Sequence, residues 1–225
     1  PKQTVESFAR SIEQAISLSP DRLVTFSYAH VPWINKRQLI LEKSGLPDNR
    51  EKRNMFDTAA KLLLESGYQS IGMDHFVRPN DELSIAMQTK KLHRNFQGYC
   101  TRRTTAQVYG LGVTAISQLE SAYAQNTKDI LHYIETIGKG ELCITKGYAL
   151  SPTEQLTREV IETLMCNGCI DWKALSNRLH VSVPTLKAAT AYDEQKLSVF
   201  ANDGLIYYTD DYLEMTTEGS AFVRN

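Results

Sequence analysis

Two successive pairs of a helix and a strand at the start of the chain constrain the fold more than any other feature. Residues 4–17 form an amphipathic pattern with Thr4 as a suitable N-cap, and residues 23–28 are a short apolar run typical of a buried strand. A second helix is predicted over 48–66 and a second strand over 69–73. Helices that alternate with strands favour parallel pairing, with the helices on the faces of the sheet. Two such pairs are too few to close a barrel, so we expect part of a larger α/β sheet whose other strands lie upstream.

The middle of the chain is predicted to begin with a long polar loop over 74–106, with a short helix near 80–89. Loops of this length in compact domains are often functional. A strand-like run over 107–114, a helix over 128–137 and a strand over 142–149 follow. The loop is therefore the first place to expect binding residues.

After residue 150 the pattern changes to short helices followed by two strands. The predicted elements are helices over 152–167, 171–179 and 184–202, strands around Tyr207 and Leu213, and a last helix from Thr217. Three helices followed by a hairpin resemble a winged helix. We expect two domains: the C-terminal part of a partial (β/α) barrel of the α/β class, with a substrate-side extension, over 1–150, and a small α+β, winged-helix-like domain over 151–225.

The composition is that of an ordinary soluble globular protein, with 42% hydrophobic and 23% charged residues. No run approaches the ~18 consecutive apolar residues that a membrane span needs, and no basic, apolar leader precedes the first helix. Residues 151–225 hold 6 Lys and Arg against 11 Asp and Glu, a net charge of −5, which leaves +4 for the first 150 residues. We therefore expect a cytoplasmic protein whose anion-binding surface lies in the first 150 residues.

The four cysteines stand at positions 100, 143, 166 and 169, and thiols in a reducing cytosol are the simplest interpretation. Cys166 and Cys169 have the spacing of a metal-binding knuckle or of a redox pair. No second pair with this spacing accompanies them, and Cys166 continues the apolar face of the predicted helix before it. We favour two incidental thiols near a helix end and predict no metal site in this chain.

The stretch His93–Tyr99 concentrates groups that can bind a polar ligand. Arg94 can hold a carboxylate with two parallel hydrogen bonds, and Gln97 can both donate and accept. Phe96 and Tyr99 can stack on a flat molecule. A polar strand with alternating faces is the competing interpretation, and we favour a binding role because such groups are rarely so dense.

Two further segments are candidates because of their position. Asp74 and His75 directly follow a predicted strand, at the end where ligands bind in parallel α/β sheets. A local cap with an exposed histidine is the equally weighted alternative for this pair. The small residues of Gly110–Ser117 would let the backbone approach a ligand closely.

Several of these stretches resemble one enzyme family, the oxygen-independent coproporphyrinogen III oxidases, which are the coproporphyrinogen dehydrogenases of the radical SAM superfamily. The resemblance covers nearly the whole chain. The matching runs are Gly72–Phe76, Leu92–Tyr99 and Gly110–Ser117, with shorter ones at Pro1–Thr4, Phe26–His30 and Tyr123–Asn126.

The resemblance implies that the chain is the C-terminal part of such an enzyme, with the end of a radical SAM barrel in residues 1–150. The family's cysteine motif for a 4Fe-4S cluster and the glycine-rich segment that holds S-adenosylmethionine would lie upstream. The family converts two propionate groups of coproporphyrinogen III to vinyl groups, giving protoporphyrinogen IX for haem biosynthesis. We expect this fragment by itself to be inactive.

The resemblance also implies roles for single residues near the cofactor. Ala29 corresponds to a residue that lines a second S-adenosylmethionine, and Ile116 to one that packs against the first. The cluster and most of the cofactor contacts would belong to the absent half, so we expect no catalytic residue in this chain.

On the substrate side, Phe96 and Gln97 correspond to pocket residues that the family needs for activity. We add Arg94 and His93 as partners of the substrate's propionates, because coproporphyrinogen III carries four carboxylates. Asp74 and His75 complete the predicted substrate pocket. The expected partners are coproporphyrinogen III, S-adenosylmethionine and an electron donor such as flavodoxin or ferredoxin, with the enzyme acting as a monomer away from membranes.

Two other functions compete with this one. A radical SAM haem chaperone is a close relative that binds haem without oxidase activity, and the His93–Tyr99 run argues against it. A nucleic-acid-binding protein would use the winged-helix-like part, whose predicted recognition helix 184–202 offers Lys187 and Lys196. The negative charge of that part argues against it, because phosphate neutralisation supplies most of non-specific affinity.

Overall fold

The computed structural model describes residues 1–96, 98–101, 107–220 and 222–223. Its contacts divide the chain into two compact units, Pro1–Ile85 and Ala86–Asn225. Helix α4 (Glu82–Gln88) spans the division. Each unit has its own apolar core. The boundary predicted after residue 150 falls inside the second unit, where the chain passes from a strand to a long helix.

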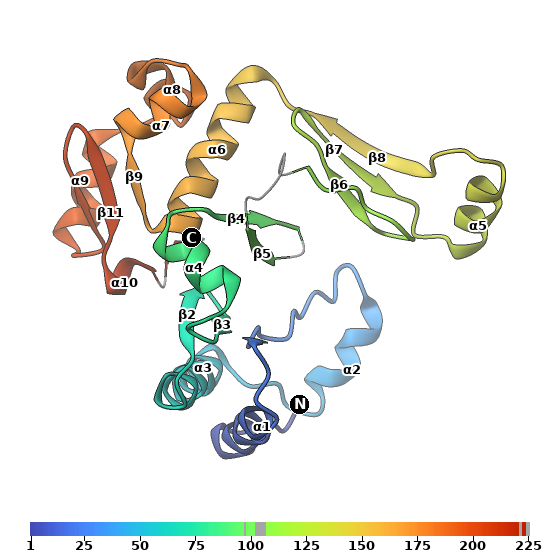
Figure 1. The fold of residues 1–225 in the computed structure, drawn as a ribbon. Coiled ribbons are helices and arrows are strands. Elements are labelled where there is room, and N and C mark those ends of the chain that lie inside the picture. The colour runs from blue at the N-terminus through green and yellow to red at the C-terminus, as the bar shows by residue number, and fades with distance from the viewer. Residues whose placement is uncertain (97, 102–106, 221, 224–225) are drawn as a thin grey trace. The chain divides into compact units, whose positions relative to one another are not determined.

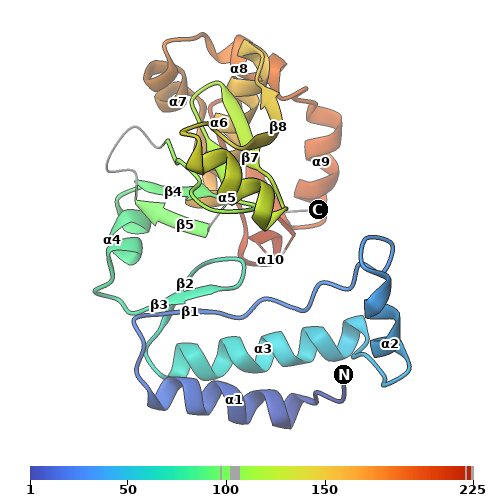
Figure 2. The same cartoon turned by 90° about the vertical axis from the view of Figure 1, so that its right-hand side faces the viewer.

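The first unit combines two long helices with a small sheet. Figure 2 shows α1 and α3 running alongside each other, with the strands to one side. Its elements are α1 (Val5–Ser17), β1 (Arg22–Val24), the 3-10 turn η1 (Lys36–Gln38), α2 (Leu39–Glu42), α3 (Asn49–Glu65), β2 (Gln69–Gly72) and β3 (His75–Val77).

The two long helices of this unit begin where the sequence predicts. The side chains of Thr4 and Asp48 each accept from the backbone N–H three residues later, and their own backbone N–H groups donate to the side chains of Ser7 and Glu51, which gives a capping box at both N-termini. The predicted stop at Gly67 is confirmed, since this residue has a φ of 84°, in the left-handed region. The core joins Ile12 of α1 to Leu63 of α3 and Phe76 of β3.

The parallel strand pairing predicted for this unit is wrong. The sheet order is β1-β3-β2, and both β1 and β2 pair with β3 in the antiparallel sense. The cause is a tight turn directly after β2, where Met73 adopts a φ of 49° and sends the chain back as β3. The first strand is also shorter than predicted, because it ends at Val24 and leaves residues 25–28 outside the sheet.

The second unit begins with strands that the sequence analysis placed in a loop. Its elements up to residue 150 are β4 (Leu92–Asn95), β5 (Gly98–Thr101), β6 (Ile116–Gln118), β7 (Ala122–Asn126), α5 (Ile130–Gly138) and β8 (Ile144–Ala149). β4 and β5 form a two-stranded hairpin, and β6, β7 and β8 form an antiparallel sheet in that order. In Figure 1, α5 lies at one end of this sheet, between β7 and β8 in the chain.

The structure has no strand over the predicted residues 107–114. Strand β6 begins at Ile116, two residues after that range. Val108 makes a single bridge to Gln118, and the following residues form a loop in which Thr114 has a φ of 63°. Asn126 closes this loop by donating to the carbonyl oxygens of Gly110 and Gly112, at 3.0 and 2.9 Å. Turn-forming glycines therefore outweighed the apolar pattern.

The described residues of the rest of the chain form five helices and a three-stranded antiparallel sheet, where the sequence predicts four helices and two strands. Its elements are α6 (Pro152–Asn167), β9 (Cys169–Asp171), α7 (Trp172–Leu179), α8 (Val183–Ala189), α9 (Glu194–Asn202), β10 (Ile206–Tyr208), β11 (Tyr212–Met215) and α10 (Thr217–Ser220). The strand order is β10-β11-β9. The core gathers Val160, Ile170, Trp172, Leu175 and Leu186.

The single helix predicted over 184–202 is instead two helices. The first ends at Ala189, and Ala191 takes a φ of 48° that a continuing helix does not allow. Asp193 then caps a new helix by accepting from the N–H groups of Gln195 and Lys196. An N-capping aspartate inside a helical pattern is the local signal for this break.

None of the helices in the described part of the chain has both the length and the apolar character required to cross a bilayer.

Candidate functional site

The hairpin of β4 and β5 carries the first group of candidate residues. Its register pairs His93 with Cys100 and Arg94 with Tyr99, so His93 and Arg94 face opposite sides of the ribbon. His93 and Tyr99 are buried, whereas Phe96, at the turn, is 57% exposed. The hairpin thus has a covered end and an open end. Gln97 lies outside the described residues.

His93 joins the hairpin to helix α6. Its Nδ1 contacts the carboxylate of Glu162, and the two side chains are only 4% and 11% exposed. A buried carboxylate needs such a partner, because leaving it without one costs several kcal/mol. The structure therefore places His93 at the contact between β4 and α6, and it is not in the wall of the cavity that Arg94 lines.

Arg94 and Phe96 line a cavity of about 600 Å³ on the other side of the hairpin. Tyr123 of β7 meets Phe96 edge to face, with ring centroids 5.3 Å apart and planes at 82°. The guanidinium carbon of Arg94 lies 5.5 Å from the centroid of the Tyr99 ring. The Nε atom of Arg94 is buried and has no hydrogen-bond partner within the described part of the chain, so Arg94 brings a cation with an unused donor to this cavity.

The other charged groups in the wall of this cavity, Glu154, Arg158 and the Glu162 that contacts His93, already have partners. Arg158 donates to the carbonyl oxygens of Leu119 and Glu120, at 3.1 and 2.7 Å. Glu154 accepts from Tyr148 and Ser151, and these bonds hold the pKa of Glu154 below its usual value, while the Tyr148 pKa is raised by the same carboxylate. Arg94 is therefore the arginine best placed to receive an anionic ligand.

Ile116 begins β6, at the end of a loop built from the small residues that the sequence analysis singled out. Gly110 packs so closely against this point that a Cβ atom there would lie 2.8 Å from the backbone of Ile116. The N–H of Gly110 donates to Ser117 at 2.9 Å, and the N–H of Gly112 donates to the hydroxyl of Tyr133 at 2.9 Å. The close backbone approach is therefore made to the chain itself, and it holds Ile116 half-buried in a defined position.

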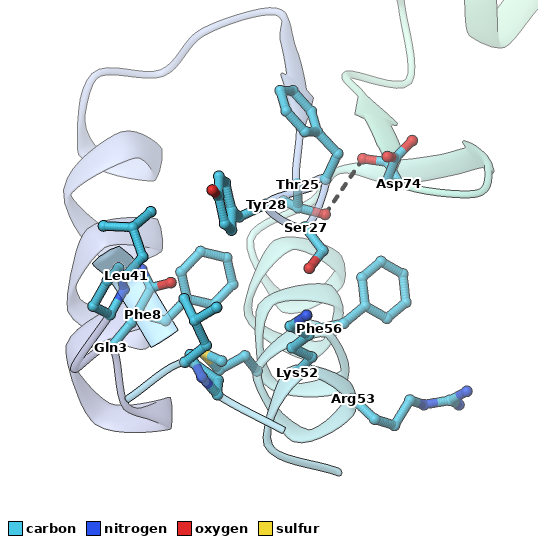
Figure 3. Close-up of a pocket in the computed structure, with 15 residues that line it drawn as sticks. Gln3, Phe8, Thr25, Ser27, Tyr28, Leu41, Lys52, Arg53, Phe56 and Asp74 are labelled. Atoms are coloured by element: carbon cyan, nitrogen blue, oxygen red, sulfur yellow. Dashed lines mark hydrogen bonds between the residues drawn. The ribbon is translucent and has the colours of Figure 1, made fainter. Parts of the chain in front are cut away.

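The remaining candidates belong to the first unit. Asp74 lines a cavity of about 680 Å³ together with Tyr28, Lys52 and Phe56 (Figure 3). His75 is bonded to Asp74 through Nδ1 at 2.8 Å, and it is outside the cavity wall. The side-chain hydroxyl of Thr25 and its N–H both donate to the carbonyl of Asp74, which keeps this turn next to the end of β1.

Ala29 is exposed in the segment that follows β1. Its carbonyl oxygen accepts from the side-chain amide of Gln38, at 3.2 Å, and that amide's oxygen accepts from the N–H of Val31, at 2.6 Å. Ala29 itself is absent from the wall of the 680 Å³ cavity. Gln38 holds the backbone of Ala29 in place. Because the alanine side chain is small and exposed, the surface there is open, whereas a larger side chain would project from it.

The structure thus brings Arg94 and Phe96 to one cavity, and Ala29, Asp74 and His75 to the other unit. Tyr123 and Arg158 are wall residues that the sequence analysis did not assign. Tyr123 lies in one of the runs that carry the resemblance, but no local signal indicates that it meets Phe96, 27 positions earlier. For Arg158, in the middle of a helix, the sequence offers no signal at all.

No group of three or more His, Cys, Asp or Glu side chains within the described residues could hold a metal ion. Cys166 and Cys169, the pair with knuckle spacing, are both buried thiols. The chain as described therefore offers no ligand set for an iron–sulfur cluster.

Comparisons with known proteins point to one family. Residues 150–222 match the family model described as the HemN C-terminal domain. The oxygen-independent coproporphyrinogen III oxidase of Helicobacter pylori is 38% identical over 225 residues, which is 100% of this chain and 48% of that protein. The enzyme of the same name from Escherichia coli is 37% identical over 225 residues, again 48% of its length.

A solved structure extends this likeness to the fold. The match is to coproporphyrinogen III oxidase (HemN) from Escherichia coli, described as a radical SAM enzyme, with a TM-score of 0.88 and 37% identity. It covers 100% of this chain and 51% of that one. The chain spans about half the length of the curated relatives it matches. By sequence over its whole length and by fold, the chain is therefore similar to about half of the length of the oxygen-independent coproporphyrinogen III oxidases.

Proposed function

We propose that this chain forms the substrate-side part of a radical SAM coproporphyrinogen III oxidase, which oxidatively decarboxylates coproporphyrinogen III to protoporphyrinogen IX. The carrying observation is the cavity lined by Arg94, Phe96 and Tyr123, where the buried Nε of Arg94 has no hydrogen-bond partner among the described residues and the two aromatic rings contact each other. Coproporphyrinogen III combines carboxylates with flat pyrrole rings, which is the chemistry that such a wall recognises.

In this proposal Arg94 binds one propionate through charge-assisted hydrogen bonds, and Phe96 and Tyr123 contact a pyrrole ring. His93 positions Arg94 and does not itself contact the substrate. Its contact with Glu162 keeps β4 against α6, which holds the neighbouring Arg94 in place. Gln97, next to Phe96 in the chain, is assigned to the same pocket on the resemblance alone. Asp74 and His75 are assigned to the substrate side of the first unit.

The cofactors of the proposed enzyme are a 4Fe-4S cluster and S-adenosylmethionine. Bound together, they would supply the radical that removes a hydrogen atom from a propionate. On the resemblance, the cluster is proposed to be held by another part of the protein. Within this chain, Ile116 is proposed to pack against one S-adenosylmethionine and Ala29 to leave room for a second.

Other features of the proposal concern the whole protein. We propose that the chain divides into two domains after residue 150. The match to the C-terminal domain of the family begins at residue 150, close to this boundary. We also propose a monomeric, cytoplasmic enzyme that receives electrons from a flavodoxin or a ferredoxin.

The winged-helix-like part gives no support to nucleic-acid binding. Lys187 donates to the carbonyl of Asp210 at 3.0 Å and lies 4.3 Å from the centroid of the Tyr192 ring, so its charge is used inside the domain. Lys196, the other basic residue of the predicted recognition helix, stands on a separate helix after the break.

The test is the affinity for coproporphyrinogen III of the full-length protein that contains this chain. Arg94→Ala is expected to weaken binding about tenfold or more, because a hydrogen bond to a charged group contributes about 1.5–3 kcal/mol. Arg94→Lys should recover only part of the loss, because an ammonium cannot form two parallel bonds. Unchanged affinity of the Arg94→Ala protein would refute the assignment.

Lys91→Ala is the matched control, since it removes a cation three positions from Arg94 that lines a different cavity. It should leave the affinity unchanged. Formation of protoporphyrinogen IX by the same unmutated protein separates the oxidase from the haem chaperone, which would bind a tetrapyrrole without turnover.

A further inference from the structure

A second cavity of the same unit brings a lysine and a cysteine into contact. Lys90 follows α4, and Cys169 is the first residue of β9. The Nζ atom of Lys90 lies 2.7 Å from the Sγ atom of Cys169. We propose that these two side chains form a covalent nitrogen–oxygen–sulfur bridge when the protein is exposed to dioxygen. This modification is independent of the proposed function.

The separation of the two atoms is the first support. An N–H···O hydrogen bond spans about 2.7–3.2 Å, and sulfur is a larger atom than oxygen. A separation of 2.7 Å between Nζ and Sγ is therefore closer than a hydrogen bond between them requires. One oxygen atom bonded to both would hold the nitrogen and the sulfur at about this separation.

The position of the lysine is the second support. Lys90 is an exposed residue, and an ammonium on a flexible stem is normally directed into water. Its Nζ atom instead contacts the sulfur of Cys169, a residue that is 6% exposed. The backbone of Lys90 is fixed by the end of α4, where its N–H donates to Met87 and the next N–H donates to Ala86. Both partners are therefore held in place, Lys90 by its backbone hydrogen bonds and Cys169 by its burial.

The surroundings give a small oxidant access and polar partners. Both residues line a cavity of about 600 Å³, together with Asn167 and Tyr212. The side-chain oxygen of Asn167 is buried and has no hydrogen-bond partner among the residues that the structure describes, so it can accept from a small polar molecule. The hydrogen bond to Cys169 raises the pKa of Tyr212 to about 12, which keeps the tyrosine a donor to the sulfur.

The chemistry balances with dioxygen as the oxidant. Lys90 reacts as the neutral amine, after releasing its third ammonium proton to water. Nζ and Sγ each lose one hydrogen, and one oxygen atom forms the new N–O and O–S bonds. The other oxygen atom leaves as water with those two hydrogens. Nitrogen and sulfur together give up the four electrons that reduce dioxygen.

Cys143 and Cys166 provide two comparisons for this contact. Cys143 is buried, and its Sγ atom lies 3.9 Å from the carbonyl oxygen of His132. Cys166 is close to Cys169 in sequence, and a disulfide between them would be the competing oxidation product. The products differ in mass, because the bridge gains one oxygen and loses two hydrogens, whereas a disulfide only loses two hydrogens.

The experiment is mass spectrometry of this 225-residue chain before and after exposure to air. We expect the mass of one added oxygen less two hydrogens, and a digest in which the peptide of Lys90 is joined to that of Cys169. A dithiol reductant should return both peptides unmodified. The bridge would join residues 79 positions apart, so the midpoint of thermal unfolding should rise on oxidation and fall back on reduction.

Four variants make the result decisive. Lys90→Met and Cys169→Ser should abolish the joined peptide and the rise in the thermal midpoint. Lys91→Met removes a second lysine of the same cavity, and Cys166→Ser removes the neighbouring thiol, so both should leave the bridge intact. Circular dichroism of each variant confirms that it is folded.

Three outcomes would overturn the proposal. One is a Cys169 that remains fully open to alkylation after exposure to air. Another is a gain of oxygen on Cys169 that leaves Lys90 free. The third is a loss of two hydrogens with Cys166 joined to Cys169, which would identify the pair as a disulfide.

Discussion

Two cavities of the second unit have the same size and share a wall residue, yet they are built for different chemistry. Each has a volume of about 600 Å³, and Glu162 of α6 lines both. In one, Arg94 has a donor with no partner among the described residues, and Phe96 and Tyr123 line the same wall. In the other, Lys90 is the lysine that contacts a sulfur. The partner of each cation, more than its charge, decides whether we expect reversible binding or a covalent bond.

The largest expected effect comes from removing the contact that stands between the two cavities. His93→Ala should lower the free energy of unfolding by about 3 kcal/mol, because the buried carboxylate of Glu162 loses a partner. Urea denaturation followed by circular dichroism measures this. Combining His93→Ala with Glu162→Gln should recover part of the loss. A decrease below about 1 kcal/mol would mean that the contact does not hold β4 against α6.

The next effect tests whether the two cavities act independently. Arg94→Ala should reduce affinity for coproporphyrinogen III about tenfold, as argued above, and leave the joined peptide of Lys90 and Cys169 unchanged. Lys90→Met should have the opposite pattern, with normal affinity and no joined peptide. The affinity for coproporphyrinogen III and the joined peptide are therefore both measured on both variants. If either variant changed both properties, the cavities would be coupled, most simply through Glu162.

A smaller effect separates the open end of the hairpin from its covered end. Phe96→Ala should cost at most about 1 kcal/mol of unfolding free energy, because the side chain is 57% exposed and loses mainly its edge contact with Tyr123. The same variant should still weaken substrate binding by the full-length protein. Denaturation and binding, measured side by side, check this. A loss as large as that of His93→Ala would show that Phe96 is needed for folding.

The smallest effect concerns Tyr212 in the cavity of Lys90. Its pKa is raised to about 12 by the hydrogen bond to Cys169, from an ordinary value near 10. The bond therefore contributes to stability below pH 10, and this contribution is lost as the pH rises through 12. Tyrosinate absorbance, taken as the difference between the unmutated chain and Tyr212→Phe, should show the late titration. Cys169→Ala should bring it back towards pH 10; titration near pH 10 in the unmutated chain would contradict the bond.

Much of the helical structure could be predicted because its signals are local. Thr4 and Asp48 cap their helices through residues only three positions away, and Gly67 stops α3 through its own backbone freedom. The same holds for α6 and α7, although the short strand β9 between them was not predicted. Where a local signal was overlooked, as with Asp193, the prediction joined two helices into one.

Strand pairing could not be predicted in the same way. The pattern of helices and strands favours parallel neighbours, but a turn at Met73 inserts β3 between β1 and β2. A strand of three residues, His75–Val77, carries little periodic signal, and its partners lie on both sides of a helix of 17 residues. Strand pairing is stabilised by hydrogen bonds between residues far apart in the chain, so no local pattern predicts it.

The sequence by itself determined the resemblance to the coproporphyrinogen III oxidases, most of the helices, and the density of polar and aromatic groups in His93–Tyr99. Only the tertiary structure decided how that stretch divides. His93 turns to the buried carboxylate of Glu162, 69 positions away, while Arg94, one residue on, faces a cavity with Tyr123. The physical reason is that adjacent residues of a strand point to opposite sides, and what stands on each side is set by α6 and β7. The contact of Lys90 with Cys169 has the same origin, since neither residue is near the other until β9 packs beside the end of α4.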